Sequence, residues 1–334
     1  MHAWIQRWWR GEAGMAGTLL DGALWPAEGL YRSITAARNA TYARGIVRVE
    51  RAEIPVISVG NLSVGGAGKT PVAAWIAGRL RSWGRAPALV LRGYADDEVK
   101  VHRELNPEVP VVVGKRRAAA VAAAKEMECD VAVVDDGFQH RALARDLDLV
   151  LVSADGWTER RRLLPRGPWR EGPSALRRAD AVIVTRKAVS QERAREVAVA
   201  LAGWGAPVVI CRIRPGRLSP LHGGPPRTLE ELAGADVLAI ASLADPRPFE
   251  QNLREAGARV ELIAFPDHHD FDQADADRIA RVRGDRPLLM TRKDAVKLRD
   301  RIPEGVDALV LEQVVTMEEG GEVLDAALRK VLGR

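Results

Sequence analysis

Residues 59–71, which read VGNLSVGGAGKTP, constrain this chain more than any other segment. They follow an apolar, strand-like run and open a helix-like one. In such a strand–loop–helix order, main-chain N–H groups and the helix N-terminus surround the phosphates of a nucleotide. Lys69 is expected to reach the β- and γ-phosphates, and the Thr70 hydroxyl to bind Mg²⁺. The predicted nucleotide-binding residues are Ser63, Val64, Gly65, Gly66, Ala67, Gly68, Lys69 and Thr70.

Ser63 stands where the general phosphate-loop pattern has a glycine. The Gly-Gly-x-Gly-Lys-Thr core that follows is intact, and the strand and helix around it are in the right places. The alternative is a flexible glycine turn that happens to precede a lysine. We interpret the segment as a variant phosphate loop.

Composition narrows the class of protein. The chain has 334 residues, of which 47% are hydrophobic and 28% charged, as in folded soluble proteins, and this length predicts two domains. A net charge of +5 and a pI near 9.4 favour anionic partners. The two cysteines, Cys129 and Cys211, have no metal-type spacing, so a reducing cytoplasm is the simplest expectation.

Short apolar runs alternate with helical patterns along the whole chain, which predicts an α/β fold with buried parallel strands. The runs are residues 56–59, 88–91, 111–113, 131–134, 149–152, 181–184, 208–210, 237–240, 260–264, 288–290 and 308–311. Helical stretches are expected at 72–80, 116–127, 249–256, 275–282 and 324–332. Residues 214–226 are rich in Pro, Gly and Arg and lack periodicity, which indicates a linker.

The predicted organisation has four parts. Residues 1–30 form an amphipathic membrane-interface segment, and 31–208 a phosphate-loop NTPase-like α/β/α domain with a parallel sheet. Residues 209–227 form the linker, and 228–334 a second, smaller α/β domain.

The N-terminal segment is rich in tryptophan. Trp4, Ile5, Trp8 and Trp9 fall within a sector of about 140° on a helix, with arginines outside it. Such a helix is typical of a membrane interface, and the alternative is a helix whose aromatic side chains pack on the domain as ordinary core. The chain has no apolar run long enough to span a bilayer, and acidic residues argue against a signal peptide.

Several clusters could perform chemistry. Asp135 and Asp136 end an apolar strand, where acids beside a phosphate loop hold Mg²⁺. His140 could touch phosphate or substrate, or simply pack or cap. Residues 265–272 (FPDHHDFD) also follow a strand, and are either a base or metal site or a surface loop in which Asp272 caps the next helix. Residues 96–98 (DDE) are either a solvated turn or the source of a base.

Arginines crowd residues 160–178, around Glu171. Such a loop could clamp phosphates or meet anionic lipid headgroups, and a solvated basic face is the alternative.

Together, these motifs resemble the tetraacyldisaccharide 4′-kinase family, the lipid A 4′-kinases, over nearly the whole chain. The motifs are residues 55–62 (PVISVGNL), 65–71 (GGAGKTP), 92–94 (RGY), 135–140 (DDGFQH), 164–171 (LPRGPWRE), 265–269 (FPDHH) and 291–297 (TRKDAVK). The Ser63 variant also occurs in that family.

The resemblance implies transfer of the ATP γ-phosphoryl group to the 4′-hydroxyl of tetraacylated glucosamine disaccharide 1-phosphate. The enzyme would be peripheral, on the cytoplasmic face of the bacterial inner membrane, with an anionic membrane surface as partner and no nucleic acid. Asp97 matches the family's catalytic aspartate, and His268 the histidine paired with it. The other implied roles fall to Thr70, Asp135, Asp136 and Glu171 for Mg²⁺, and to Asp267, Gln139, His140 and Arg170 as supporting residues.

The chain departs from the family pattern at four places. The insertion that the family usually has between Tyr94 and Asp97 is almost missing. On either side of Asp97, Asp96 and Val99 stand where the family has Gly and Pro. Residues 242–246 read SLADP in place of GIGNP. Arg292 replaces a usual glutamate.

Two other functions remain as alternatives. One is a membrane-recruited ATPase or GTPase switch without lipid kinase activity. The sequence Thr291-Arg292-Lys293-Asp294 lacks the lysine that guanine recognition needs at its second position. The other is a nucleic-acid-dependent ATPase, but the chain has no recognisable nucleic-acid module.

Overall fold

The computed structural model describes residues 2–93, 96–158, 160–243 and 245–333. Its α-helices are α1 (His2–Arg10), α2 (Gly14–Ala43), α3 (Lys69–Ser82), α4 (Asp96–Leu105), α5 (Arg117–Glu126), α6 (Gln191–Ala202), α7 (Arg247–Glu255), α8 (Gln273–Arg283), α9 (Arg292–Leu298) and α10 (Gly321–Leu332). Short 3₁₀-helices lie at Pro173–Arg178, Leu229–Leu232 and Arg299–Arg301.

The strands all belong to one 11-stranded sheet of order β3-β2-β4-β1-β5-β6-β7-β11-β10-β8-β9. They are β1 (Val56–Asn61), β2 (Pro87–Leu91), β3 (Val111–Val113), β4 (Val131–Asp135), β5 (Leu147–Ser153), β6 (Ala181–Arg186), β7 (Val208–Pro220), β8 (Asp236–Ala241), β9 (Arg259–Ala264), β10 (Leu288–Thr291) and β11 (Ala308–Glu319). Neighbouring strands are parallel except β7 and β11, which are antiparallel. The predicted α/β class is confirmed.

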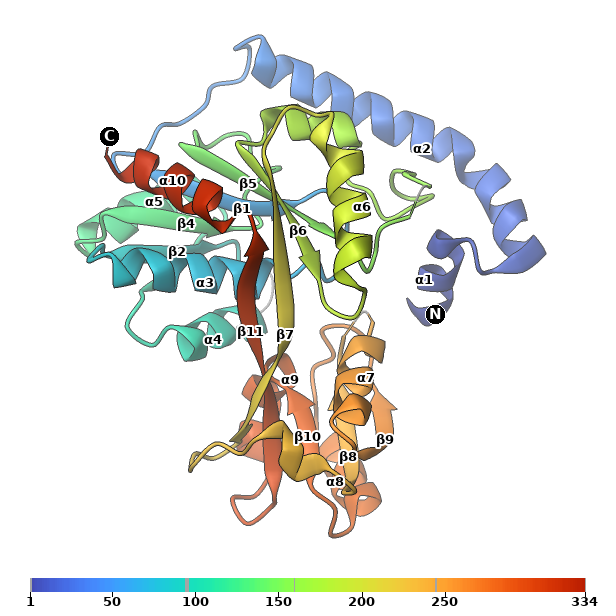
Figure 1. Cartoon of the computed structure of the whole chain (residues 1–334). Helices are drawn as coiled ribbons and strands as arrows, with labels where there is room; N and C mark the ends of the chain where they lie inside the picture. The colour runs from blue at the N-terminus through green and yellow to red at the C-terminus, as the bar shows by residue number, and fades with distance from the viewer. Residues whose placement is uncertain (1, 94–95, 159, 244, 334) are drawn as a thin grey trace.

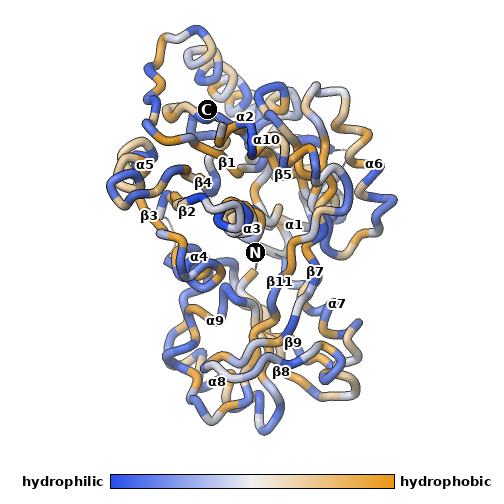
Figure 2. Tube along the Cα trace, turned by 60° about the vertical axis from the view of Figure 1, so that its left-hand side comes forward, coloured by the Kyte–Doolittle hydropathy of each residue, from blue (hydrophilic) through white to orange (hydrophobic). Residues whose placement is uncertain are grey.

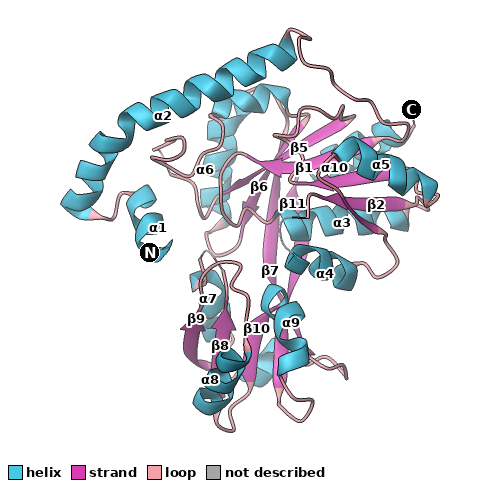
Figure 3. Ribbon diagram, turned by 180° about the vertical axis from the view of Figure 1, so that it is seen from behind, coloured by secondary structure: helices cyan, strands magenta, loops and turns pink. Residues whose placement is uncertain are grey.

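The sheet is shared by two bodies (Figure 1). The first body contains β1–β6 with α1–α6 and α10, and the second contains β8–β10 with α7–α9. In the first body α3 and α10 pack on one face of the sheet, and α5 and α6 on the other. In the second body α8 and α9 pack on one face and α7 on the other. Figure 3 shows β7 passing from one body to the other.

The prediction of an irregular linker at residues 209–227 is wrong, because residues 208–220 form β7. This strand pairs with β11 from Ile210↔Glu319 to Pro220↔Leu309. Cys211, Ile213 and Leu218 are buried, and arginines alternate with the buried residues. Figure 2 colours the whole chain, this strand included, by hydropathy. An alternating strand half exposed to solvent lacks the continuous apolar run by which the other strands were recognised.

The expected outer boundaries also differ from the packing. Helix α2 continues well past residue 30, to Ala43. Helix α10 lies in sequence after the second body, but Leu324, Leu328 and Val331 are buried in the core of the first body. Residues 228–334 are therefore not one separate packing unit.

The tryptophans of the N-terminal helices differ in burial. Trp8 is buried, and its indole N–H donates to Gly17 O at 3.1 Å and to Asp21 Oδ1 at 3.2 Å. For Trp8 the packed-core alternative is therefore correct. Trp4 and Trp25 are exposed. No helix in the described part of the chain is both long enough and apolar enough to cross a bilayer.

Candidate active site

The phosphate loop, residues 63–70, connects β1 to α3 as predicted. Gly65 and Gly68 have positive φ values of 109° and 83°, and α3 begins at Lys69. The Asn61 side chain donates to Ser63 O at 2.5 Å and accepts from Lys69 Nζ at 3.2 Å. The loop amides and the α3 N-terminus therefore have the arrangement that binds phosphate oxygens.

Gly68 is the loop position least able to accept a side chain. A Cβ atom there would lie 2.2 Å from Ile213 Cδ1 of β7, at a φ that L-residues rarely adopt. We expect Gly68→Ala to weaken ATP binding at least about 10-fold, with a loss of stability of roughly 1–3 kcal/mol from the strained backbone. Fluorescence titration with a labelled ATP analogue and thermal unfolding measure the two effects.

Gly45 provides the matched control for that variant. Its φ is 69°, but a Cβ atom there meets nothing within 4 Å. Gly45→Ala should therefore carry the backbone strain without the collision and leave ATP binding unchanged. Equal ATP affinity in both variants would refute the role given to the close approach of Gly68.

Two side chains at the end of β6 donate hydrogen bonds to carbonyl groups of the phosphate loop. Neither side chain was among the predicted site residues. Thr185 Oγ1 donates to Ala67 O at 2.9 Å, and Lys187 Nζ donates to Gly66 O at 3.0 Å. The Asp155 carboxylate accepts from the backbone N–H of Lys187 at 2.7 Å and fixes this turn. Burial lowers the pKa of Lys187. The available signal was a threonine and a lysine at the end of a strand near the phosphate-loop strand.

Asp136 faces the loop, as predicted. It has a positive φ of 54°, and its carboxylate lies 3.4 Å from Lys69 Nζ and 2.9 Å from Arg170 Nη1. Burial acts to raise the pKa of Asp136, but Lys69 and Arg170 outweigh it, and the pKa is lowered. Asp136 therefore stays ionised beside the lysine that would hold the phosphates.

Asp135 is placed differently from Asp136. It is the last residue of β4, pairs in register with Val59 of β1, and is buried. Its Oδ2 lies 3.0 Å from Nε2 of the fully buried His102 on α4. Its Oδ1 has no hydrogen-bond partner among the described residues. His102 was not among the predicted site residues.

The supporting residues Gln139 and His140 lie on the turn after Asp136. Gln139 Nε2 donates to Asn61 O at 2.8 Å and so supports the strand that leads into the phosphate loop. Burial, and then the charges of Arg117, Arg92, Arg145 and Arg38, lower the pKa of His140. A neutral imidazole surrounded by arginines is suited to a site that accepts an anionic group.

Glu171 is buried, and both of its carboxylate oxygens are already engaged. Arg178 donates to them at 3.0 Å, and Asn39 Nδ2 donates to Oε2 at 2.7 Å. The neighbouring residue Arg170 reaches Asp136, as described above, so this segment lies against the site. A direct metal contact by Glu171 would require Arg178 to move.

Two arginines of the arginine-rich stretch pair with acids of α2. Arg166 Nη1 donates to Glu28 Oε2 at 3.0 Å, and Arg162 forms an ion pair with Asp21. Leu163 N donates to Glu28 Oε1 at 2.8 Å. The acids of α2 thus hold the loop against the first body, and the solvated-face alternative does not apply to Arg162 and Arg166.

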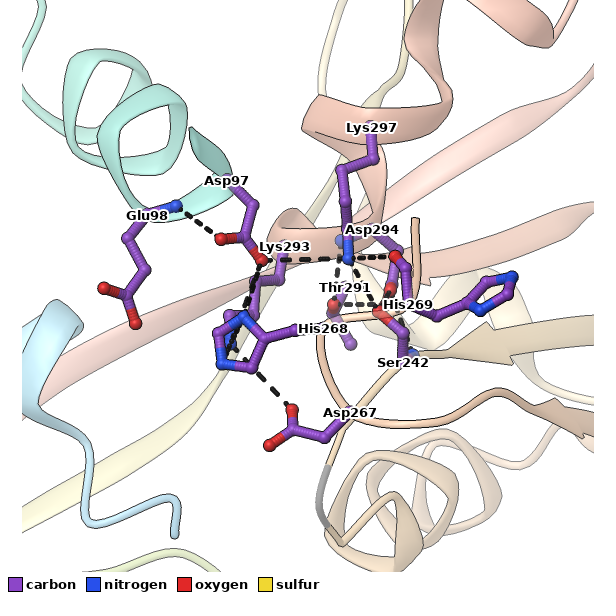
Figure 4. A network of polar contacts seen from close by, with 10 residues as sticks. All are labelled: Asp97, Glu98, Ser242, Asp267, His268, His269, Thr291, Lys293, Asp294 and Lys297. Atoms are coloured by element: carbon purple, nitrogen blue, oxygen red, sulfur yellow. Dashed lines mark hydrogen bonds and ion pairs between the residues drawn. The ribbon is translucent and has the colours of Figure 1, made fainter. Parts of the chain in front are cut away.

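The second cluster lies between the two bodies (Figure 4). Asp97, in the first turn of α4, is buried, and its Oδ2 lies 3.2 Å from His268 Nδ1. His268 has a positive φ of 57°, an uncommon conformation for a non-glycine residue. Asp267 Oδ1 lies 4.0 Å from Lys293 Nζ. The structure therefore brings together Asp97, His268 and Asp267, as the family resemblance implied.

Two lysines of α9 complete this cluster and were missed as site residues. Lys297 Nζ lies 3.7 Å and Lys293 Nζ 4.0 Å from Asp97 Oδ2. Lys293 Nζ is also 3.1 Å from His268 Nε2. The 291–297 motif was the available signal, because it follows an apolar strand and carries both lysines on one helix.

The loops of the second body are fixed by a buried network. Asp294 accepts from Ser242 N at 2.9 Å and from the Ser242 and Thr291 hydroxyls, and Lys297 Nζ donates to His269 O at 2.7 Å. Asp272 caps α8 by accepting from Asp275 N at 2.9 Å. The 265–272 segment therefore does both things that the sequence left open: it caps a helix and presents a histidine to the site.

The pKa of Glu98 is shifted by burial and by charges both from the Asp97–His268 cluster and from Asp135 beside the phosphate loop. Burial, and then the charge of Asp135, raise its pKa, with Asp97 contributing in the same direction. Lys293 and His268 act in the opposite direction. Tyr94, part of the 92–94 motif, lies outside the described residues.

The donors near the phosphate loop fit a magnesium ion that also uses nucleotide oxygens. No group of three or more His, Cys, Asp or Glu side chains that could hold a metal occurs among the described residues. Mg²⁺ in kinase sites is held by one or two carboxylates together with substrate phosphates, so such a group is not required. The unpartnered Asp135 Oδ1 and the Thr70 hydroxyl supply oxygens of the right chemistry.

Comparisons with known proteins agree with this geometry. A family model for tetraacyldisaccharide-1-P 4′-kinase matches residues 20–333. The tetraacyldisaccharide 4′-kinases of Anaeromyxobacter dehalogenans (strain 2CP-C) and Halorhodospira halophila are 39% and 35% identical to this chain. They align over 96% and 93% of the chain, and over 93% of their own length in both cases.

Among solved structures, LpxK from Aquifex aeolicus in complex with ATP matches with a TM-score of 0.76 and 28% sequence identity. The match covers 94% of this chain and 99% of that one. The predicted fold is confirmed, and so is the family resemblance. The chain belongs to the tetraacyldisaccharide 4′-kinase family and is a phosphotransferase.

Proposed function

We propose that this protein transfers the γ-phosphoryl group of ATP to the 4′-hydroxyl of a tetraacylated glucosamine disaccharide 1-phosphate. The observation that carries the proposal is the 3.2 Å contact between Asp97 and His268, in a protein that also has a phosphate loop between β1 and α3. Helix α4 connects the two: Asp97 lies in its first turn, and His102 near its end contacts Asp135 beside the phosphate-loop strand.

The proposed reaction forms a bond between the 4′-oxygen and the γ-phosphorus and breaks the bond to the β,γ-bridging oxygen. Lys69 and the loop amides hold the β- and γ-phosphates in place. Asp97 accepts the 4′-hydroxyl proton, and His268 orients its carboxylate through Oδ2. Lys293 stands next to both groups, with its Nζ 3.1 Å from His268 Nε2 and 4.0 Å from Asp97 Oδ2.

Mg²⁺ would be held by Thr70, Asp135 and Asp136, and would neutralise charge on the phosphate oxygens when bound. Glu171 is not a direct metal ligand in this arrangement: Arg178 occupies its carboxylate, and the adjacent Arg170 is the residue that reaches Asp136. Lys69 and Arg170 keep Asp136 ionised, which a metal-binding carboxylate requires.

The test is transfer of label from γ-labelled ATP to purified tetraacyldisaccharide 1-phosphate. The expected product is a labelled lipid that depends on both ATP and the disaccharide. A nucleotide switch would hydrolyse ATP without labelling the lipid, and a nucleic-acid-dependent ATPase would need added RNA or DNA. Either of these outcomes would overturn the proposal.

The protein is also proposed to bind the cytoplasmic face of the inner membrane through α2. At about 100° per residue, the buried Gly17, Asp21 and Glu28 lie within a sector of about 40°. Met15, Leu19, Leu30 and Ile34 lie on the opposite side and are 60–81% exposed, whereas the exposed Trp25 lies nearer the buried side. The apolar stripe thus faces away from the protein, as in helices that lie in a membrane interface.

Replacing Leu19, Trp25 and Ile34 together with serine is expected to weaken binding to vesicles containing anionic lipid by about 10²-fold. Each large apolar side chain contributes up to roughly 1.5–3 kcal/mol when fully buried. Co-sedimentation with phosphatidylglycerol vesicles measures the change. Val199→Ser, which removes an equally exposed apolar residue from α6, should leave vesicle binding unaltered. Unchanged binding of the triple variant would rule out α2 as the anchor.

A further inference from the structure

The pair formed by His102 and Asp135 joins α4 to the strand tip beside the phosphate loop. His102 is fully buried and Asp135 is 5% exposed, and the contact between Nε2 and Oδ2 measures 3.0 Å. Asp135 Oδ1 and His102 Nδ1, both buried, have no hydrogen-bond partner among the described residues.

This geometry makes the two oxygens of Asp135 unequal. A carboxylate oxygen accepts, so Nε2 of His102 carries the hydrogen and donates it to Oδ2. Rotation of the carboxylate about its χ2 bond would break this hydrogen bond, so the imidazole fixes its orientation. Leaving a buried carboxylate oxygen without any partner is costly, so Oδ1 is suited to a ligand that the apoprotein lacks.

The register of the sheet indicates what that ligand is. Asp135 pairs with Val59, two residues before Asn61, whose side chain accepts from Lys69. An oxygen at this strand end lies beside the phosphate loop, where the metal ion of a bound nucleotide is expected.

We propose that His102 is a positioning residue: it holds Asp135 so that Oδ1 faces the Mg²⁺ of the bound nucleotide. The inference rests on the proposed kinase function and extends it to a residue outside the phosphate loop and the Asp97–His268 pair. Because α4 carries both Asp97 and His102, one helix sets the positions of the base and of a metal-binding acid.

A purely structural role would predict something different. If His102 only packed α4 on the sheet, its replacement would lower stability and leave the Mg²⁺ dependence of nucleotide binding unchanged. A hydrogen-bond partner that orients a metal ligand typically contributes 10–100-fold to metal affinity. A measurement of Mg²⁺ binding therefore distinguishes a positioning role of His102 from a packing role.

The experiment titrates Mg²⁺ into protein holding a fluorescent, non-hydrolysable ATP analogue. His102→Met has similar reach but no N–H, and should weaken apparent Mg²⁺ affinity about 10–100-fold, with metal-free analogue affinity unchanged. His102→Gln keeps an N–H at the reach of Nε2 and should restore Mg²⁺ affinity to within about 3-fold. His222→Met removes a histidine bonded to Ile302 O in the second body, and should have no effect.

A second measurement uses the unmodified protein, in case His102→Met does not fold. Mn²⁺ bound with the analogue in place of Mg²⁺ should broaden the imidazole signals of His102 in ¹⁵N-histidine spectra, and leave those of His222 sharp. Unbroadened His102 signals, or wild-type Mg²⁺ affinity in a folded His102→Met variant, would overturn the inference. Neither measurement uses lipid, so failure of lipid phosphorylation and failure of this inference are separate outcomes.

Discussion

Replacing Lys69 with methionine should lower kcat for lipid phosphorylation by about 10³-fold or more. Removing one preorganised donor from a developing negative charge costs about 10²–10³-fold, and Lys69 contributes a full charge as well. The substitution also removes one of the two cations beside Asp136, and the pKa of Asp136 should rise. Steady-state transfer of labelled phosphate to the disaccharide measures the loss.

Lys125 supplies the control for Lys69. It lies on the exposed face of α5 and pairs with Glu53, so Lys125→Met removes the same charge away from the site. This variant should keep wild-type turnover. Turnover within 10-fold of wild type for Lys69→Met, with the fold intact, would contradict the role given to Lys69.

Replacing Asp97 with asparagine should lower kcat about 10²–10⁴-fold, because a positioned base contributes a factor of that size. Affinity for ATP should be unchanged, since Asp97 contacts His268 and the α9 lysines and has no recorded contact with the phosphate loop. Single-turnover transfer, measured beside equilibrium binding of an ATP analogue, separates the two quantities.

His268→Gln should cause a smaller loss than Asp97→Asn, on the order of 10-fold, because the histidine acts through the aspartate. The double variant should be little worse than Asp97→Asn alone, since residues that work as a unit are not additive. Near-normal turnover of Asp97→Asn would show that the base is another group, and full additivity would show that His268 does not act through Asp97.

Much of the fold was predictable, because a buried parallel strand is a continuous apolar run that can be recognised from its own residues alone. Each run predicted from the sequence lies within an observed strand. The antiparallel pairing of β7 with β11 was not predictable. Arginines on the solvent face of β7 obscure the alternation of buried apolar residues such as Ile213. The return of α10 to the first body depends on long-range packing that no local pattern encodes.

The same distinction applies to the candidate site: groups of residues adjacent in sequence were predictable, and residues that only the fold brings together were not. Local order of residues was enough to identify the phosphate loop and the acids at the end of β4. His102 was missed because it reaches Asp135 across 33 residues of chain, and histidine on a helix carries no signal of its own. Lys293 and Lys297 were quoted in a motif, but their proximity to Asp97 arises only when α4 and α9 meet.

The antiparallel ladder between β7 and β11 sets how the enzyme can admit its substrate. A loop would let one half swing about a few free backbone dihedrals, whereas two hydrogen-bonded strands resist such rotation. If Asp97 and His268 separate to admit the substrate, we therefore expect the ladder to bend or twist at its register shifts, between Leu311 and Gln313 and between Met317 and Glu319. The distance between proton acceptor and imidazole would then depend on the elasticity of a β-ribbon.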